Sequence, residues 1–476
     1  MTASEPTPAP DPTTLGALRD SGHVHRTVKA ELRGNLLARL AAGTDRFPGI
    51  VGFDETVLPQ VERALLAGHD VVFLGERGQG KTRLIRTIVG LLDEWTPVVA
   101  GCEINDHPYE PGCAACKVKL ALHGEELPVH WKHRDDRFGE KLATPDTSVG
   151  DLIGDVDPVK VAEGRTLGDP ETVHYGLVPR TNRGVFSINE LPDLAERIQV
   201  SLLNVLEERD IQVRGYTLRL PLDLLLVASA NPEDYTNRGR IITPLKDRFG
   251  AEVRTHYPLR LEDELRLIRQ EAVLTWTGSP LGSPTVPDHL LEVVARFTRL
   301  VREAPQVDPR SGVSARLSIA AAETVASSAV RRAALLGEEV ATARVVDLGA
   351  IIPAVRGKIE FDQLEEGREE DVLAHLLRRA VAETFRARLA GTDLSGLQRR
   401  FDQEGPVETG DLVSAAELLR RVGPVPGLGA VLTRLGVDGV ESPGQAAAAL
   451  ELAMEGLHLN RRLAKEELPG RTVYGG

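Results

Sequence analysis

One short motif limits what this chain can fold into more than any other feature of its sequence. The residues from 75 to 82 read GERGQGKT, which fits G-x-x-x-x-G-K-[ST]. The apolar run DVVFL comes directly before them, and a helical pattern, TRLIRTIVGLLDEW, begins at the final threonine of the motif. A strand, a glycine-rich loop and a helix in this order surround an anion with backbone N–H groups and a helix N-terminus. A chance glycine-rich turn is the alternative, but the complete context favours a phosphate site formed by Gly75, Glu76, Arg77, Gly78, Gln79, Gly80, Lys81 and Thr82.

Two side chains of this motif carry the expected chemistry. Lys81 is predicted to reach the β and γ phosphates, and the hydroxyl of Thr82 to bind Mg²⁺. ATP and Mg²⁺ are therefore the expected cofactors.

Short apolar runs alternate with helical stretches between about residues 47 and 257. The strand-like runs VVFL, PVVA, GVFSI, LLLVASA and AEVRTHY are separated by more than a dozen residues each. Such spacing requires crossover connections and predicts an α/β fold with a parallel sheet and helices on both faces. From residue 258 onward the pattern is mostly helical.

Two of these strands end in polar side chains at the sheet edge where ligands bind. Asn189 and Glu190 follow GVFSI, and Asn231 follows LLLVASA. A carboxylate at this edge can polarise a water toward the γ-phosphate, so Glu190 is the predicted catalytic base, with a solvated strand-end acid as the alternative. Asn231 can contact the same water, or it can be a turn-forming residue before proline.

The segment from residue 50 to about 258 resembles AAA+ ATPases of the magnesium chelatase ATPase-subunit and MoxR type. The motifs that carry the resemblance are GERGQGKT, YGLVPRTNRGVFSINELPDL, QVSLLNVLEERDIQVRG and LLLVASANPEDYTNRGRIITPLKDRFG, in this order. It implies an AAA+ core at 47–257 followed by a helical lid at 258–365. Proline and small polar residues cannot form a packed core, so residues 1 to about 13 are predicted to be a disordered arm, with helices from there to residue 46. The helical patches of the sequence predict a mostly helical C-terminal region at 366–476. The segment IQVRGYTLRLPLD resembles the inserted β-hairpin of this family.

The resemblance also implies roles and partners. Asn231 would be the first sensor, Arg248 the arginine finger that enters a neighbouring subunit, and Arg316, in GVSARLSIAAAETV, the second sensor. A planar guanidinium suits phosphate oxygens, although Arg248 could instead pair with Asp247 or nearby acids, and Arg316 could lie on a solvated helix face. The family implies a homo-oligomeric, hexameric ring that drives remodelling or metal insertion in a partner with a von Willebrand A domain.

The residue before the predicted base departs from the family pattern. The family usually has aspartate there, whereas this chain has Asn189. An amide can hydrogen-bond a metal-bound water but adds no negative charge, so affinity for Mg²⁺ could fall. A slow or nucleotide-sensing ATPase is therefore an alternative.

All three cysteines lie within fifteen residues, in an insertion at about 101–150. Cys113 and Cys116 form a C-x₂-C pair, and with Cys102 and His107 they predict a structural, tetrahedral Zn²⁺ site. Substitute fourth ligands are His123, His130 and His133. Free thiols or a Cys113–Cys116 redox pair are the alternatives.

Composition narrows the class of protein. The chain has 476 residues, of which 42% are hydrophobic and 27% charged, and these proportions are typical of globular proteins. Its net charge of −13 argues against a nucleic-acid partner. No apolar run approaches the roughly 18 residues of a membrane span. With three cysteines and an acidic, proline-rich start, the sequence predicts a cytoplasmic protein. A DNA-linked AAA+ protein is the disfavoured alternative, since the substrate-loop motif GAFTGA is absent.

Overall fold

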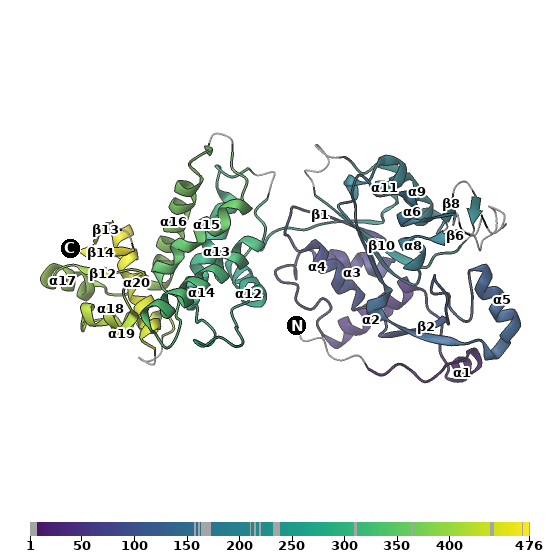
Figure 1. Ribbon diagram of the computed structural model, residues 1–476, viewed down its shortest axis with the longest axis horizontal. Coiled ribbons are helices and arrows are strands. Elements are labelled where there is room, and N and C mark those ends of the chain that lie inside the picture. The colour runs from purple at the N-terminus through teal and green to yellow at the C-terminus, as the bar shows by residue number, and fades with distance from the viewer. Residues whose placement is uncertain are drawn as a thin grey trace. The chain divides into compact units, whose positions relative to one another are not determined.

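A computed structural model shows two compact units, Met1–His256 and Tyr257–Gly476 (Figure 1). The structure describes residues 7–156, 173–209, 220–231, 239–308, 312–362, 365–437, 442–468 and 470–475, with 159, 162, 211–213 and 216–218.

The first unit is built on a five-stranded sheet in which every pairing is parallel. The order across the sheet is β11, β1, β10, β7, β4, so the first strand in the chain lies between the last and the fourth. This arrangement confirms the predicted α/β P-loop fold. The strands are β1 Val71–Leu74, β4 Phe138–Leu142, β7 Gly184–Asn189, β10 Leu224–Ala230 and β11 Ala251–Arg254.

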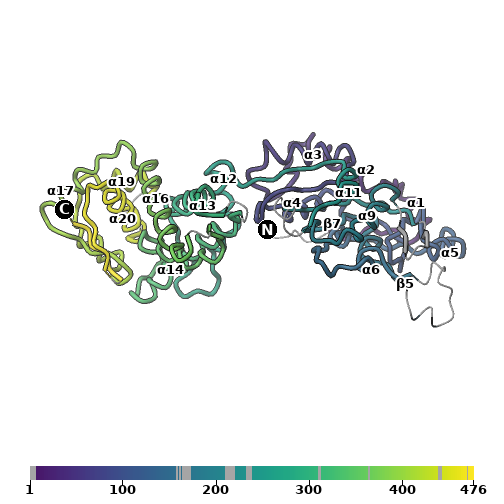
Figure 2. Tube along the Cα trace, turned by 90° about the horizontal axis from the view of Figure 1, so that it is seen from above, coloured from purple at the N-terminus to yellow at the C-terminus, as the bar shows by residue number. Residues whose placement is uncertain are grey.

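Alternate residues of these strands pack on opposite faces of the sheet, as the twofold repeat of a strand requires. In β1, Val71 and Phe73 join a core shared with α2 and α3, whereas Val72 and Leu74 join a core shared with α9. Figure 2 shows the traces of these three helices in the first unit. Both faces are therefore covered, as predicted. The helices of this unit include α1 Leu15–Asp20, α2 Val28–Ala42, α3 Leu58–Ala67, α4 Lys81–Val89, α5 Ala114–His123, α6 Val149–Leu152, α8 Leu177–Arg180, α9 Glu196–Glu207 and α11 Thr243–Arg248.

One predicted strand of the parallel sheet was wrong. The run PVVA lies in β2 (Trp95–Val99), which pairs antiparallel with β3 (Val129–His133) in a separate two-stranded sheet. Pro97 has no N–H to donate, which suits a strand outside the centre of a sheet. The fifth strand of the parallel sheet is instead β4. This strand forms a half-exposed edge, so its sequence FGEKL is polar and was not recognised as a strand.

The predicted disorder of the N-terminal arm was also wrong for residues 7–13, while residues 1–6 lie outside the described part. The arm runs along the two-stranded sheet formed by β2 and β3. The carbonyl of Thr13 accepts from the N–H of Val129 at 2.8 Å, and that of Pro12 accepts from the Trp131 indole at 2.7 Å. Proline lacks a donor but keeps its carbonyl acceptor, and this is the group that the arm uses. The expected β-hairpin before β10 is present as β8 Ile211–Val213 and β9 Tyr216–Leu218.

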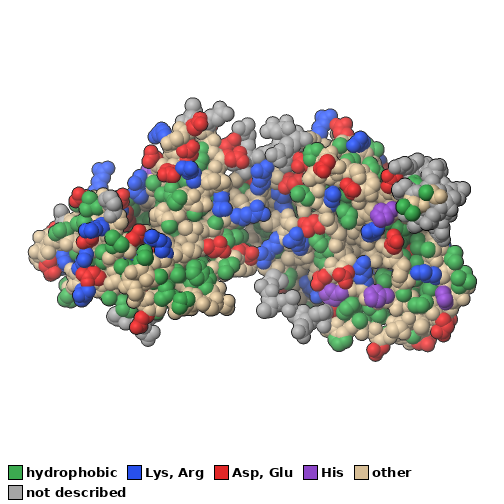
Figure 3. Space-filling view, viewed as in Figure 1, with side chains coloured by type: hydrophobic (Ala, Val, Ile, Leu, Met, Phe, Trp, Pro, Cys, Tyr) green, Lys and Arg blue, Asp and Glu red, His purple; other side chains and the backbone are tan. Residues whose placement is uncertain are grey.

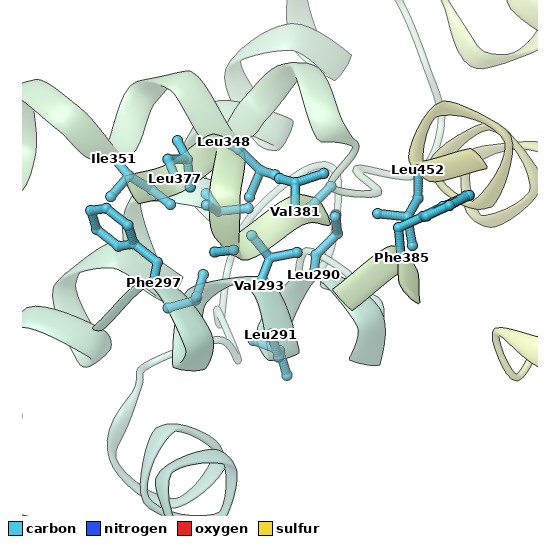
Figure 4. Close-up of a cluster of buried hydrophobic side chains, with 14 of the residues drawn as sticks. Leu290, Leu291, Val293, Phe297, Leu348, Ile351, Leu377, Val381, Phe385 and Leu452 are labelled. Carbon is cyan, nitrogen blue, oxygen red and sulfur yellow. The ribbon is translucent and has the colours of Figure 1, made fainter. Parts of the chain in front are cut away.

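The second unit is mainly helical and has one hydrophobic core that runs from Leu265 to Tyr474. Figure 4 shows its centre, where Leu290 and Phe297 of α13 face Leu377 and Val381 of α16. A division into a lid and a C-terminal region near residue 365 stays a prediction. The sequence did not predict the small antiparallel sheet β12–β14–β13. The elements are α12 Leu261–Glu271, α13 Asp288–Glu303, α14 Arg316–Leu336, α15 Ile351–Val355, α16 Glu369–Leu389, α17 Ser395–Glu404, β12 Val407–Thr409, α18 Ala415–Val422, α19 Leu428–Arg434, α20 Pro443–Leu459, β13 Ala464–Leu468 and β14 Arg471–Gly475.

A buried histidine in this core predicts a pH-dependent stability. His289 of α13 is 1% exposed, and removal from water lowers its pKa to about 4. The unfolded chain takes up this proton near pH 6.5 and the folded chain only near pH 4, so stability falls as the pH drops through this window. Between pH 7 and pH 5 the parent should lose about 2 kcal/mol more unfolding free energy than His289→Leu.

Urea unfolding at both pH values, followed by circular dichroism, measures this difference. His375→Leu is the matched control, because His375 is exposed on α16 of the same unit. An equal pH dependence in the parent and in His289→Leu would show that His289 does not cause the loss.

Candidate functional site

The phosphate loop joins β1 to α4 at the carboxyl edge of the sheet, and its glycines are required by geometry. Gly78 and Gly80 have φ angles of 73° and 80°, where a side chain is strained. At Gly75 a Cβ atom would lie 2.0 Å from Oγ1 of Thr255 and 2.3 Å from Oε1 of Gln79. No other residue fits there without displacing both neighbours.

Gln79 fixes the shape of the loop, a role that the sequence did not reveal. Its side-chain oxygen accepts from the N–H of Glu76 at 3.1 Å and from the Thr255 hydroxyl at 2.8 Å. These bonds tie the loop to the residue after β11, since Thr255 donates its own N–H to Leu74 O at 2.8 Å.

The loop fits a bound phosphate chain by the chemistry of its donors. Lys81 and Thr82 open α4, and the first N–H groups of a helix have no intrahelical acceptor. Together with the helix dipole, they attract an anion. Arg77 is exposed at the tip of the loop and Thr82 is half-buried. A pocket of about 330 Å³ opens beside the loop and is lined by Leu74, Gly75, Glu76, Gln79, Lys246, Arg254 and Thr255.

A chain of hydrogen bonds connects the loop lysine to the predicted base. Lys81 is only 8% exposed, and its ammonium donates to the Gly75 carbonyl, to Glu76 O at 2.9 Å and to Oδ1 of Asn231 at 2.8 Å. The amide nitrogen of Asn231 donates to Oε2 of Glu190, also at 2.8 Å. The structure thus brings Lys81, Asn231 and Glu190 together from three different segments.

Glu190 occupies a backbone conformation that is rare for its residue type. It directly follows β7, and its φ of 56° lies in the left-handed region. Such a conformation costs of order 1–3 kcal/mol and is concentrated at functional sites. The turn directs the chain from the strand into the short helix Leu191–Asp193, which leaves the carboxylate beside Asn231.

Asn189 contacts a carboxylate from the neighbouring strand. Its amide nitrogen donates to Oε1 of Glu140 at 2.6 Å, and its oxygen accepts from the Ser229 hydroxyl at 3.1 Å. Glu140 also pairs with Arg86 of α4 at 2.8 Å. A negative charge therefore lies next to position 189, on β4. The sequence did not reveal Glu140, because β4 itself was not recognised.

The two arginines predicted from the family resemblance lie in different units. Arg248 ends α11 and pairs with Glu207 of α9, with Nε 2.7 Å from Oε2. Within one chain it thus forms the internal salt bridge considered as the alternative, with Glu207 in place of Asp247. Arg316 is the exposed first residue of α14 in the second unit.

The three cysteines converge in the insertion, but His107 does not join them. Ligand atoms of Cys102, Asp106, Cys113 and Cys116 all lie within 4.8 Å of one another. The ring of His107 instead stacks on His25 at 4.0 Å, and its Nδ1 accepts from the N–H of Tyr109. The prediction of His107 as fourth member was wrong.

The substitute histidines also lie elsewhere. His123 and His130 are exposed, and His133 contacts Asp135 at 3.4 Å. Several histidines are visible on the surface of the first unit in Figure 3.

The crowding of the thiols changes their acidity. Hydrogen bonds from the thiols of Cys113 and Cys116 lower the pKa of Cys102 to about 2. The same contacts raise the pKa of Cys113 to about 12 and that of Cys116 well above its usual value. Burial, followed by the Cys102 charge, raises the pKa of Asp106.

Comparison with known proteins confirms the predicted resemblance to magnesium chelatase ATPase subunits. The chain is 28% identical over 341 residues to magnesium-chelatase subunit ChlI-2 of Arabidopsis thaliana, covering 67% of this chain and 76% of the relative. It is 26% identical to subunit ChlI of Nephroselmis olivacea over 67% of this chain and 90% of that one. Against subunit ChlI of Nostoc the identity is 29%, over 44% of this chain and 54% of the relative.

Two further comparisons give weaker likenesses. A family model described as the Sigma-54 interaction domain matches residues 165–248. A chain in a cryo-EM-based structure of the complex between subunits BchI and BchD of magnesium chelatase is 23% identical, with a TM-score of 0.36, over 69% of this chain and 98% of that chain.

Among the described residues, no helix has the length and apolar character needed to cross a bilayer.

The contact between Asn189 and Glu140 predicts the effect of restoring the usual aspartate. In Asn189→Asp two carboxylates face each other across 2.6 Å, so the nucleotide-free protein should lose about 1–3 kcal/mol of stability. Adding Glu140→Gln should recover most of the loss, because the glutamine amide can donate to the new carboxylate. The second change also removes the Arg86 ion pair, but this arginine is 62% exposed and the pair contributes little.

Thermal unfolding of the parent, both single variants and the double variant measures the coupling. Independent, additive effects of the two substitutions would contradict the contact.

Proposed function

We propose that the chain is an AAA+ ATPase that binds and hydrolyses Mg-ATP in an oligomeric ring to remodel, or insert a metal into, a partner protein. The observation that carries the proposal is the bonded series Lys81–Asn231–Glu190 at the end of a phosphate loop. It unites a phosphate-binding cation, a neutral sensor and a carboxylate base at one sheet edge. The likeness to magnesium chelatase subunits supports the same function.

Three residues have different roles in hydrolysis: Lys81, Glu190 and Asn231. Lys81 exchanges the carbonyls of Gly75 and Glu76 for phosphate oxygens, which accept from an ammonium more strongly because they are charged. Glu190 accepts the proton of the attacking water and orients it. Asn231 bonds both residues, so it holds the carboxylate in place relative to the lysine.

The residues that could hold Mg²⁺ form a site with little negative charge of its own. The bound ion would neutralise phosphate oxygens as the terminal bond breaks. Thr82 supplies a hydroxyl, and Asn189 would act through a metal-bound water. Glu140 accepts a hydrogen bond from the Asn189 amide and thereby places a negative charge beside this position.

A nucleotide-controlled switch with little hydrolysis is the second candidate, because position 189 is neutral. A DNA-linked function has the partial match to the Sigma-54 interaction domain in its favour, and the net charge of −13 against it. The proposed partner is a protein with a von Willebrand A domain.

Binding and hydrolysis should separate in two variants. Lys81→Ala should lose ATP affinity, because it removes the ammonium that contacts the phosphates. Glu190→Gln should bind ATP as the parent does but hydrolyse it about 10²-fold more slowly or worse, because an amide cannot accept the proton. Binding of a fluorescent ATP analogue and steady-state phosphate release measure the two steps.

Glu196→Gln is the matched control, an exposed acid six residues beyond Glu190, and should hydrolyse ATP at the parent rate. Parent-rate hydrolysis by Glu190→Gln would refute the base assignment. ATP binding without measurable turnover in the parent would favour the switch.

The ring proposal predicts complementation between subunits. Arg248→Ala should slow hydrolysis on the order of 10³-fold if the arginine reaches a neighbour's phosphate. Mixing it with Lys81→Ala should restore activity, because some interfaces then combine an intact loop with an intact arginine. The intrachain pair with Glu207, which is 53% exposed, is weak enough to be exchanged on assembly.

Sedimentation of the ATP-bound Glu190→Gln protein measures the size of the assembly, and Arg63→Ala, an exposed arginine of α3, serves as control. A monomer with full activity would contradict the ring.

A further inference from the structure

The insertion holds a second cluster of side chains, separate from the phosphate site. Cys102 and Asp106 lie in the loop after β2, Cys113 caps α5, and Cys116 lies in its first turn. Their four ligand atoms lie within 4.8 Å of one another. Zinc–sulfur bonds of about 2.3 Å place the sulfurs of a tetrahedral site about 3.8 Å apart, so closing the set needs movements of about 1 Å.

The surrounding backbone holds these four side chains in position. The N–H of Asp106 donates to the sulfur of Cys102 at 3.4 Å, and that of Cys116 to the sulfur of Cys113 at 3.3 Å. The N–H of Cys113 donates to Oδ2 of Asp106 at 2.9 Å. Hydrogen bonds of this kind orient metal ligands and stabilise their negative charge.

Burial makes the cluster costly without a cation. Asp106 is 3% exposed, Cys113 8% and Cys116 1%. A buried carboxylate among sulfurs is unfavourable unless a positive charge compensates it. Thiolates are soft ligands that favour zinc over Mg²⁺, and three sulfurs with one oxygen form a closed tetrahedral set.

We propose that Cys102, Asp106, Cys113 and Cys116 bind one structural Zn²⁺, with Asp106 in the place that the sequence assigned to His107. This proposal is independent of the ATPase function. It requires no change of fold, because all four side chains already converge.

The loop that carries Cys102 and Asp106 is held by hydrogen bonds to the segment that leads into β7. Asn105, with a φ of 55°, donates to the carbonyls of Arg180 at 2.7 Å and Asn182 at 3.1 Å. Asn182 returns a bond to Ile104 O at 2.9 Å. These contacts lie at the start of β7, whereas Glu190 follows its last residue. Because a strand rises about 3.3 Å per residue, the contacts and Glu190 lie about 20 Å apart. The zinc therefore stabilises the base of the strand without contacting the nucleotide.

Metal analysis of the full-length protein, purified without a histidine tag or added chelator, tests the proposal. We expect one zinc per chain in the parent, and more than a ten-fold loss of zinc affinity in Asp106→Ala. His107→Asn is the matched control and should retain zinc, because an amide oxygen can still accept from the N–H of Tyr109. Retention by Asp106→Ala with loss in His107→Asn would overturn the assignment of Asp106.

A second measurement avoids variants that fail to fold. Co²⁺ exchanged into the parent should give the intense visible and sulfur-to-metal absorption of a tetrahedral thiolate site. Folded parent protein with substoichiometric zinc, no such absorption and three freely titratable thiols would overturn the site altogether. ATP binding should be equal in the zinc-loaded and the folded chelated protein.

Discussion

A buried ammonium group governs the architecture of the phosphate site. Lys81 is almost excluded from water, so each of its protons needs an acceptor inside the protein. The acceptors are two carbonyls of its own loop and the amide of Asn231. They can converge only because neighbouring parallel strands end at the same edge, with Leu74 of β1 opposite Ala230 of β10. The strand order thus determines which side chains can meet the lysine.

The same constraint explains why the sequence predicted so much of this site. The loop pattern fixes Lys81, and strongly apolar strands end directly before Glu190 and Asn231. Each feature is local, so the sequence alone reveals it. Gln79 and Glu140 were missed because their roles depend on Thr255 and Asn189, which are distant in the chain.

The errors in the fold have physical causes as well. Apolar character identifies central strands, so the polar edge strand β4 was overlooked and the apolar β2 was put in its place. The arm at residues 7–13 was expected to be disordered because proline and small polar residues cannot form a packed core. Two tryptophans of this two-stranded sheet, Trp95 of β2 and Trp131 of β3, instead donate to carbonyls of the arm. In the insertion, the spacing of the cysteines could not show that the side chain of Asp106, and not that of His107, lies beside them.

The bond between Asn189 and Glu140 has a consequence for comparing such chains with one another. Two adjacent strands share one amide and one carboxylate, and acids on both strands at once would repel each other and lower the stability. The two positions are therefore expected to covary, with an acid on β7 accompanied by a neutral residue on β4. A chain judged by the strand-end position alone would be scored as lacking an acid that its neighbouring strand carries.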